Sequence, residues 1–155
     1  MRIAVVNNSG IRVNRTGVRS LAERLLRKSA RRAGCQWGEV SICLADDARI
    51  RDINRSFLGH DYPTDVISFT YESIPGEGKA LLSGEVIINA AMALRLGRRF
   101  GGANRELALY LAHGCDHLSG AEDHTPALRQ RMRRRELRWL HEARREGLLQ
   151  KLWTQ

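Results

Sequence analysis

Three of the five histidines fall within twelve positions, and their spacing suits the binding of a metal ion. His113 and His117 are four residues apart, so on a helix both side chains share one face, ~6 Å apart along the axis. Gly120 can adopt the backbone angles that end a helix, and the chain then returns with His124 as a third imidazole. The pattern H-x3-H-x6-H therefore predicts one metal site with His113, His117 and His124 as ligands.

Three imidazoles would hold a divalent ion, most simply one zinc ion, and leave a coordination position open. An open position is typical of catalytic zinc, whereas structural zinc sites are usually closed by four ligands rich in cysteine. Cys115 lies off the ligand face of the helix and is not expected to close the site. We therefore expect a catalytic metal; a structural or incidental metal and a chance cluster of histidines are the alternatives.

Gly114 and Asp116 decide which chemistry such a metal would serve. Zinc proteases of the H-E-x-x-H type carry their general base directly after the first histidine, where this chain has a glycine. Peptide hydrolysis by that route is therefore disfavoured. Asp116 is the only carboxylate in the helical part of the motif, so it is a candidate catalytic residue that orients a ligand or accepts a proton. A solvated surface aspartate is the equal alternative.

Composition points to a polyanionic partner. The 155 residues carry 26 Lys+Arg against 17 Asp+Glu, a formal net charge of +9, and arginine suits phosphate. The three cysteines are odd in number and form no CxxC pair, which indicates reduced thiols rather than a disulfide framework. No apolar run is long enough for a signal peptide or a membrane span, so we expect a cytoplasmic protein that does not bind a membrane.

Hydrophobic periodicity predicts one domain, residues 1–155, of the α+β class: a small mixed four-stranded sheet packed by about five helices. Strands are expected at 2–7, 39–45, 65–71 and 84–90, the last two as a hairpin with a loop at 73–82. Helices are expected at 18–33, 46–58, 90–101, from Asn104 as N-cap through the histidine motif, and from Thr125 and Pro126 onward. The C-terminal ten residues are expected either to fray or to pack back.

Three segments of the chain resemble the YbeY family of rRNA-maturation endoribonucleases. "HGCDHLSGAEDH" matches the family's histidine signature, "INRSFLGHDYPTDVISF" at 53–69 is similar to its proline-containing segment, and "GEVII" at 84–88 to one of its strands. The resemblance covers nearly the whole chain in the right order. It implies a zincin-like fold, a zinc ion on the three histidines, and hydrolytic cleavage of single-stranded RNA in rRNA maturation and ribosome quality control, with the ribosome or a ribosomal subunit as partner.

The chain departs from the family pattern at three points. Leu58 stands where the family has a functionally important arginine; Arg55, taken here as a candidate catalytic residue, or Arg51 is expected to replace it. Asp116 stands where a leucine is common. One extra residue precedes His124, which leaves Asp123 as the alternative third ligand. A non-catalytic, zinc-stabilised factor that binds RNA or the ribosome is therefore the alternative function.

Overall fold

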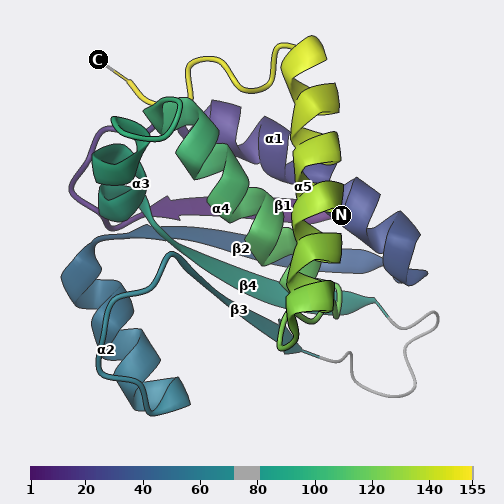
Figure 1. The fold of residues 1–155 in the computed structure, drawn as a ribbon, viewed down its shortest axis with the longest axis horizontal. Coiled ribbons are helices and arrows are strands. Elements are labelled where there is room, and N and C mark those ends of the chain that lie inside the picture. The colour runs from purple at the N-terminus through teal and green to yellow at the C-terminus, as the bar shows by residue number, and fades with distance from the viewer. Residues whose placement is uncertain (72–80, 155) are drawn as a thin grey trace.

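The computed structural model describes residues 1–71 and 81–154 (Figure 1). Within them the elements are β1 (Arg2–Asn7), α1 (Arg15–Ala33), β2 (Trp37–Ala45), α2 (Asp47–Leu58), β3 (Val66–Tyr71), β4 (Leu82–Asn89), α3 (Ala90–Gly97), α4 (Ala103–Leu118) and α5 (Pro126–Arg145). The predicted α+β fold, with a mixed four-stranded sheet and five helices among the described residues, is confirmed. Most of the loop expected at 73–82 lies outside these residues.

The sheet has the strand order β1-β2-β4-β3. Strands β1, β2 and β4 are parallel, and β3 runs antiparallel to β4 as the predicted hairpin partner. The register places Val5, Ile42, Val86 and Ser68 in one row across the four strands. Ser68 ends this otherwise apolar row on the edge strand β3, and its side chain contacts α4.

The two faces of the sheet are covered unequally. Helices α1, α4 and α5 pack on one face and form the main core with side chains such as Leu25, Ile42 and Leu111 (Figure 1). Helix α2 packs on the other face, where Ile50 meets Cys43, Ile67 and Ile87 in a small cluster. None of the helices in the described residues combines the length and the apolar composition that a membrane span requires.

Side-chain caps mark where four of the described helices begin: Asn14 for α1, Asp46 for α2, Asn89 for α3 and Thr125 for α5. Asn14 accepts a hydrogen bond from the Gly17 amide, so α1 starts at Arg15, three residues earlier than the apolar periodicity predicts. Asp46 caps α2. Thr125 caps α5, whose first residue is Pro126, as expected. Gly34 ends α1 with a φ of 68°.

The start of α4 was predicted wrongly. Asn104 does not cap this helix; it lies in the first turn, and its Oδ1 accepts a hydrogen bond from the Leu152 amide at 3.0 Å. The C-terminal segment thus packs back: Leu149 and Leu152 are buried, and Trp153 forms an antiparallel bridge with Val13. Asn104, which the sequence suggests as a local N-cap, instead makes a long-range hydrogen bond.

Candidate metal centre

Helix α4 holds the first two histidines at the edge of the core. Its buried leucines, including Leu107, Leu111 and Leu118, face the sheet and α1, while His113 and His117 are only partly buried. The two rings lie edge to face, with centroids 4.4 Å apart, and the Nε2 atoms are 3.0 Å apart. The predicted pair is therefore brought together on one helix face.

The third group beside this pair is Asp123, and not His124. Gly120, with a φ of 89°, reverses the chain after α4. Asp123 Oδ2 then lies 3.2 Å from His117 Nε2 and 3.6 Å from His113 Nε2. The side chain of His124 is 67 % exposed, and its Nδ1 is 3.6 Å from Glu122 Oε2. Successive side chains of non-helical chain point in different directions, so the one-residue extension brings Asp123 into the position expected for His124.

The hydrogen bonds of the two rings fix which nitrogens carry protons. His113 Nδ1 lies 2.6 Å from Glu136 Oε1, and His117 Nδ1 lies 2.9 Å from the Ala121 carbonyl oxygen. Both partners accept hydrogen bonds, so each Nδ1 is the donor. In the neutral rings both Nε2 atoms then present lone pairs, and these converge with a carboxylate oxygen of Asp123. Three acceptors this close together need a proton or a metal cation between them.

The donor set fits a divalent metal ion. His113, His117 and Asp123 each offer one ligand atom, and these atoms all lie within 4.8 Å of one another. Tetrahedral zinc with ligand bonds of ~2.0–2.1 Å separates its ligand atoms by ~3.3 Å, close to the observed 3.0, 3.2 and 3.6 Å. The hydrogen bonds to Glu136 and Ala121 supply the outer contacts by which metal-binding histidines are usually oriented.

Glu136 of α5 is a site residue that the sequence did not reveal. Its side chain is 1 % exposed and contacts His113. Burial alone would lower the pKa of His113, but the hydrogen bond and charge of Glu136, with the charges of Asp65 and Asp123, raise it above its usual value. Glu136 lies between Met132 and Trp139 in the sequence of α5, and all three side chains are buried. An acid on an apolar stripe was the available signal.

Gly114 has a structural role between the two histidines. A Cβ at this position would lie 2.5 Å from Val86 Cγ1 and 2.8 Å from Val66 Cγ2, so only glycine lets α4 approach β3 and β4 this closely. Ser68 Oγ donates a hydrogen bond to the Gly114 carbonyl at 2.9 Å. The residue after the first histidine thus faces the sheet, and a glutamate there would collide with it.

Asp116 lies on α4 but is engaged elsewhere. Its side chain is 0 % exposed; Oδ1 accepts a hydrogen bond from Arg32 Nε at 3.0 Å, and Oδ2 accepts two from Arg135, at 2.9 and 2.6 Å. This cluster joins α1, α4 and α5. Asp116 is therefore not the solvated surface residue named as one alternative, and its carboxylate is bound to arginines and not to the histidines. Cys115 is also buried, which raises the pKa of its thiol and keeps it protonated.

The arginines expected to replace the family residue are paired on α2. Arg55 bonds Asp52 at 3.0 Å and Arg51 bonds Asp61 at 2.9 Å. Neither lines the hollow of 390 Å³ that adjoins His117, although Leu58 of the same helix does. We call this the Leu58 hollow; among the described residues, its other lining side chains include Asn54, His60, Tyr62, Thr64 and Ser68.

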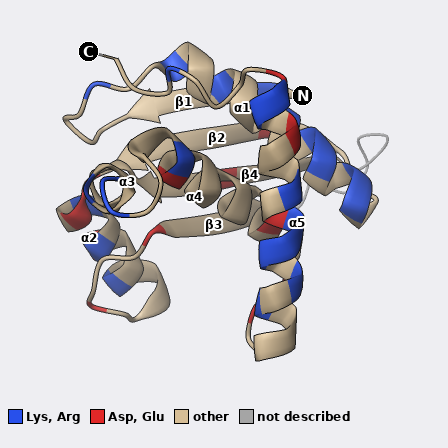
Figure 2. Ribbon diagram, turned by 45° about the horizontal axis from the view of Figure 1, so that its top comes forward, with Lys and Arg blue, Asp and Glu red and all other residues tan. Residues whose placement is uncertain are grey.

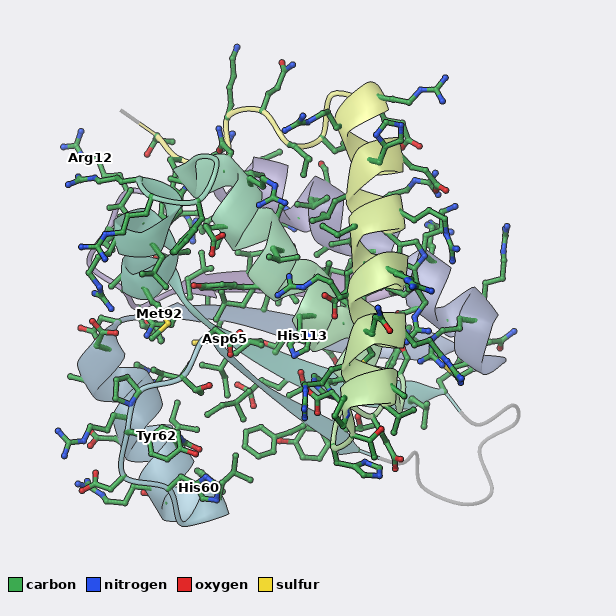
Figure 3. All side chains as sticks on the ribbon, viewed as in Figure 1. Arg12, His60, Tyr62, Asp65, Met92 and His113 are labelled. Atoms are coloured by element: carbon green, nitrogen blue, oxygen red, sulfur yellow. The ribbon has the colours of Figure 1, made fainter. Side chains whose placement is uncertain are left out.

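A second hollow, of 560 Å³, adjoins His113. We call it the Phe100 hollow; it lies between α3, α4 and α5 and is lined by Asp65, Leu96, Phe100, Arg105, Glu106, Leu109, Tyr110, His113, Arg133 and Leu137. Figure 3 shows Asp65 and His113 close together, with His60 and Tyr62 toward α2. The candidate metal centre thus lies between two hollows, one touching each histidine.

Comparison with known proteins shows which family the chain resembles. A family model described as Endoribonuclease YbeY matches residues 4–144. Proteins named Endoribonuclease YbeY are 45 % identical over 108 residues in Rhodopirellula baltica and 43 % identical over 137 residues in Anaeromyxobacter sp. (strain Fw109-5). These matches cover 67 % and 84 % of this chain.

The same matches span 53 % of the Rhodopirellula protein and 68 % of the Anaeromyxobacter protein, so this chain corresponds to between half and about two thirds of those relatives. The solution structure of TM1509 from Thermotoga maritima superposes with a TM-score of 0.54 over 94 % of both chains at 20 % identity, which supports the fold. The extent of the family match and the identity of these relatives show that the chain belongs to the family described as Endoribonuclease YbeY.

Proposed function

We propose that the protein is a zinc-dependent endoribonuclease that hydrolyses single-stranded RNA in rRNA maturation and ribosome quality control. The observation that carries the proposal is the convergence of His113 Nε2, His117 Nε2 and Asp123 Oδ2 between two hollows, in a chain of this family. Its partners would be rRNA and the ribosome or a ribosomal subunit, and its compartment the cytoplasm.

One zinc ion would be held by His113, His117 and Asp123, with His124 as the competing third ligand. A divalent ion held by three protein ligands supplies Lewis-acid chemistry, polarising a phosphoryl oxygen and making water a stronger nucleophile. Glu136 accepts a hydrogen bond from His113 Nδ1–H and so keeps the Nε2 lone pair directed at the ligand position. The Ala121 carbonyl does the same for His117.

Arginines near His113 are better placed than Arg55 to offset charge on the phosphate. Arg133 lines the Phe100 hollow together with His113, and its NH1 is 4.0 Å from Glu136 Oε2. We therefore assign to Arg133 the electrostatic role first expected of Arg55. Basic positions continue along α5 (Figure 2), where they can contact further phosphates of the strand. Asp116, saturated by two arginines, is assigned a structural role instead of a catalytic one.

Cleavage of a single-stranded RNA by the zinc-loaded protein tests the proposal, with His113→Ala as the inactive variant. His141→Ala is the matched control, because His141 is exposed on α5 and outside the proposed ligand set. We expect wild type and His141→Ala to cleave single strands in preference to duplex, and His113→Ala or added chelator to abolish cleavage. Stoichiometric zinc binding by a highly purified sample that cleaves no RNA would overturn the enzymatic claim.

Leu58 favours one alternative function, a zinc-stabilised factor that binds RNA or the ribosome without cleaving it. This leucine lines the hollow beside His117, at the position where the family resemblance implies an arginine. In that case chelation should lower the melting temperature while the affinity for RNA persists. For the enzyme, Leu58→Arg should maintain or increase cleavage; for the binding factor, it should create no cleavage.

A further inference from the structure

Glu106 differs from the other buried carboxylates of the described residues in having no cation. Three acidic side chains are buried there: Glu106, Asp116 and Glu136. Asp116 is paired with two arginines and Glu136 with His113. Glu106 is 7 % exposed, and in residues 1–71 and 81–154 it forms no salt bridge. Because Glu106 lines a hollow and none of its oxygens is used in an ion pair among the described residues, the carboxylate is available to accept hydrogen bonds from a ligand.

Tyr110 is the partner of this carboxylate. Burial, followed by the charges of Glu106 and Asp65 and a hydrogen bond with Glu106, raises the pKa of the Tyr110 hydroxyl far above its usual value. The hydroxyl therefore stays protonated and is a hydrogen-bond donor beside Glu106. The charge of Arg95 lowers the pKa of Tyr110 slightly, but Arg95 itself is paired with Asp47 at 3.0 Å. A carboxylate accepts about four hydrogen bonds, so Glu106 keeps acceptor sites for a ligand.

Helix α4 aligns this pair with the metal centre. Glu106, Tyr110 and His113 are spaced i, i+4 and i+7, which places them on one face of the helix. All three line the Phe100 hollow, whose volume of 560 Å³ lies within the range of small-ligand sites, ~300–1,000 Å³. A group bound against Glu106 would thus be a neighbour of a group bound at His113.

The other walls of the hollow suit a flat ring attached to a phosphate. Phe100 is 58 % exposed and offers an aromatic face, with Leu96 and Leu137 as apolar neighbours. Arg105 NH1 donates to the Phe100 carbonyl oxygen at 3.2 Å, which holds this segment against α4. Arg105 and Arg133 bring positive charge to the same hollow. Aromatic stacking combined with arginines is the usual way in which proteins bind single-stranded nucleic acid.

We propose that the Phe100 hollow binds the nucleobase next to the scissile phosphate, stacked on Phe100, and that Glu106 selects bases that carry an exocyclic amino group. The inference rests on the proposed endoribonuclease function and specifies its substrate preference. Adenine, cytosine and guanine can donate from an amino group to the carboxylate. Uracil has only one ring N–H, flanked by two carbonyl oxygens that Glu106 would repel, so it is the disfavoured base.

This selection can be tested with two sets of short RNAs. One set varies only the base on the 5′ side of the cleaved linkage, and the other varies only the base on the 3′ side. We expect wild type to prefer adenine, cytosine or guanine over uracil by about tenfold in kcat/KM at one of the two positions. Glu106→Gln should reduce this preference to less than about threefold, because an amide can donate to the uracil oxygens as well as accept.

Phe100→Ala tests the stacking face, with Phe57→Ala as its matched control. Phe57 is 71 % exposed and packs on Phe69, away from the Phe100 hollow. We expect Phe100→Ala to raise KM about tenfold or more with kcat nearly unchanged, and Phe57→Ala to change neither. Because Phe100 is exposed, this variant should keep its melting temperature, so it tests the subsite even where Glu106→Gln proves unstable.

Binding of nucleoside monophosphates to the metal-free protein separates this inference from the proposed function. Wild type should bind AMP, CMP or GMP more tightly than UMP, and Phe100→Ala should lose that affinity, whether or not the protein cleaves RNA. Equal affinity for all four nucleotides, unchanged in Phe100→Ala, overturns the base subsite. In that event cleavage by wild type and its loss in His113→Ala would still support the endoribonuclease.

Discussion

Helix α4 contributes to two clusters of charged and polar side chains that differ in how their charges are balanced. In the first cluster, Asp116 accepts hydrogen bonds from Arg32 and Arg135 and is fully buried. In the second, His113, His117 and Asp123 bring three acceptor atoms within 3.6 Å of one another. The first cluster contains its own cations. In the second, the Nδ1 protons of both rings are directed away from Asp123, to Glu136 and Ala121, so the Nε2 atoms face the carboxylate and can take up either a proton or a metal ion.

This difference distinguishes a structural carboxylate from a ligand carboxylate better than residue type does. Asp116 is closer to the histidines in sequence than Asp123 is, yet its charge is already balanced by the fold. Among the described residues, the partly exposed Asp123 carboxylate pairs with His113 and His117, so its charge is available to a bound metal. Removing each aspartate should therefore affect a different property: the stability of the fold for Asp116, and the affinity for metal for Asp123.

The largest expected effect is the loss of stability in Asp116→Ala. The substitution leaves the Arg32 and Arg135 guanidinium groups partly buried without a counter-ion, at a cost of about 3–5 kcal/mol in the free energy of unfolding. Urea unfolding of the zinc-free protein measures this loss. The folded fraction should still bind zinc with an affinity close to that of wild type.

A triple variant provides the control for that experiment. Replacing the whole cluster, as in Asp116→Leu/Arg32→Met/Arg135→Met, removes the unpaired charges and should recover most of the lost stability. A loss of less than about 1 kcal/mol in Asp116→Ala, or a metal affinity that falls with stability, would show that the two clusters are not separate.

The next effect is the loss of metal affinity in Asp123→Ala, compared with His124→Ala. Removing a ligand should weaken zinc binding by more than ~100-fold, because the loss of an outer hydrogen-bond partner alone costs 10- to 100-fold. His124→Ala should change the affinity less than about threefold, since this side chain is exposed and directed to Glu122. Competition with a chromogenic chelator measures both. The reverse ranking of the two variants would restore the ligand set expected from the sequence.

The sequence predicts the histidine pair, and the group that lies beside this pair in the structure is Asp123, the alternative to His124 that the sequence left open. The i, i+4 spacing of His113 and His117 determines their common face as soon as the segment is helical, and that prediction needs no tertiary information. The choice between Asp123 and His124 depends on which of two adjacent side chains turns inward after Gly120. Spacing alone leaves that choice open, because a non-helical turn can direct either residue to the pair.

The helices and strands were largely predictable because local sequence signals define them. At the start of α4, where the prediction was wrong, a long-range contact was the reason. Thr125 caps α5 as its sequence context predicts, and Asp46, expected as the first residue of α2, is instead its N-cap. Asn104 looks equivalent but binds the distant Leu152 amide. Glu136 is 23 residues from His113, so nothing local connects the two. The contacts that sequence reasoning missed join segments that are far apart in the chain.

A smaller effect is expected from Glu136→Gln, which keeps the shape of the side chain and removes its charge. The amide can still accept the His113 Nδ1 hydrogen bond, but it no longer raises the basicity of the ring, so zinc affinity should fall about 10- to 100-fold. Calorimetric titration of both proteins with zinc measures the change. Glu142→Gln is the matched control, because that carboxylate pairs with Lys28 on the surface of α1 and α5.

The smallest effect is a dependence of stability on pH that should change sign when zinc is added. The pKa of His113 is raised in the folded protein, so its stabilising proton is fully bound below the unfolded value of about 6.5 and is lost as pH rises through the folded value. Zinc-free protein should therefore melt a few degrees lower at pH 8 than at pH 6. Zinc competes with that proton, so the stabilisation by zinc should instead grow over the same range.

Thermal melts of Glu136→Gln test whether this slope comes from the metal centre. In this variant His113 loses both the hydrogen bond to a carboxylate and the negative charge of Glu136, which together raise its pKa. The zinc-free variant should therefore melt at nearly the same temperature at pH 6 and pH 8. His141→Ala should keep the wild-type slope, because its ring lies outside the site. A slope that persists in Glu136→Gln would assign the titration to another group and weaken the contrast between the two clusters of α4.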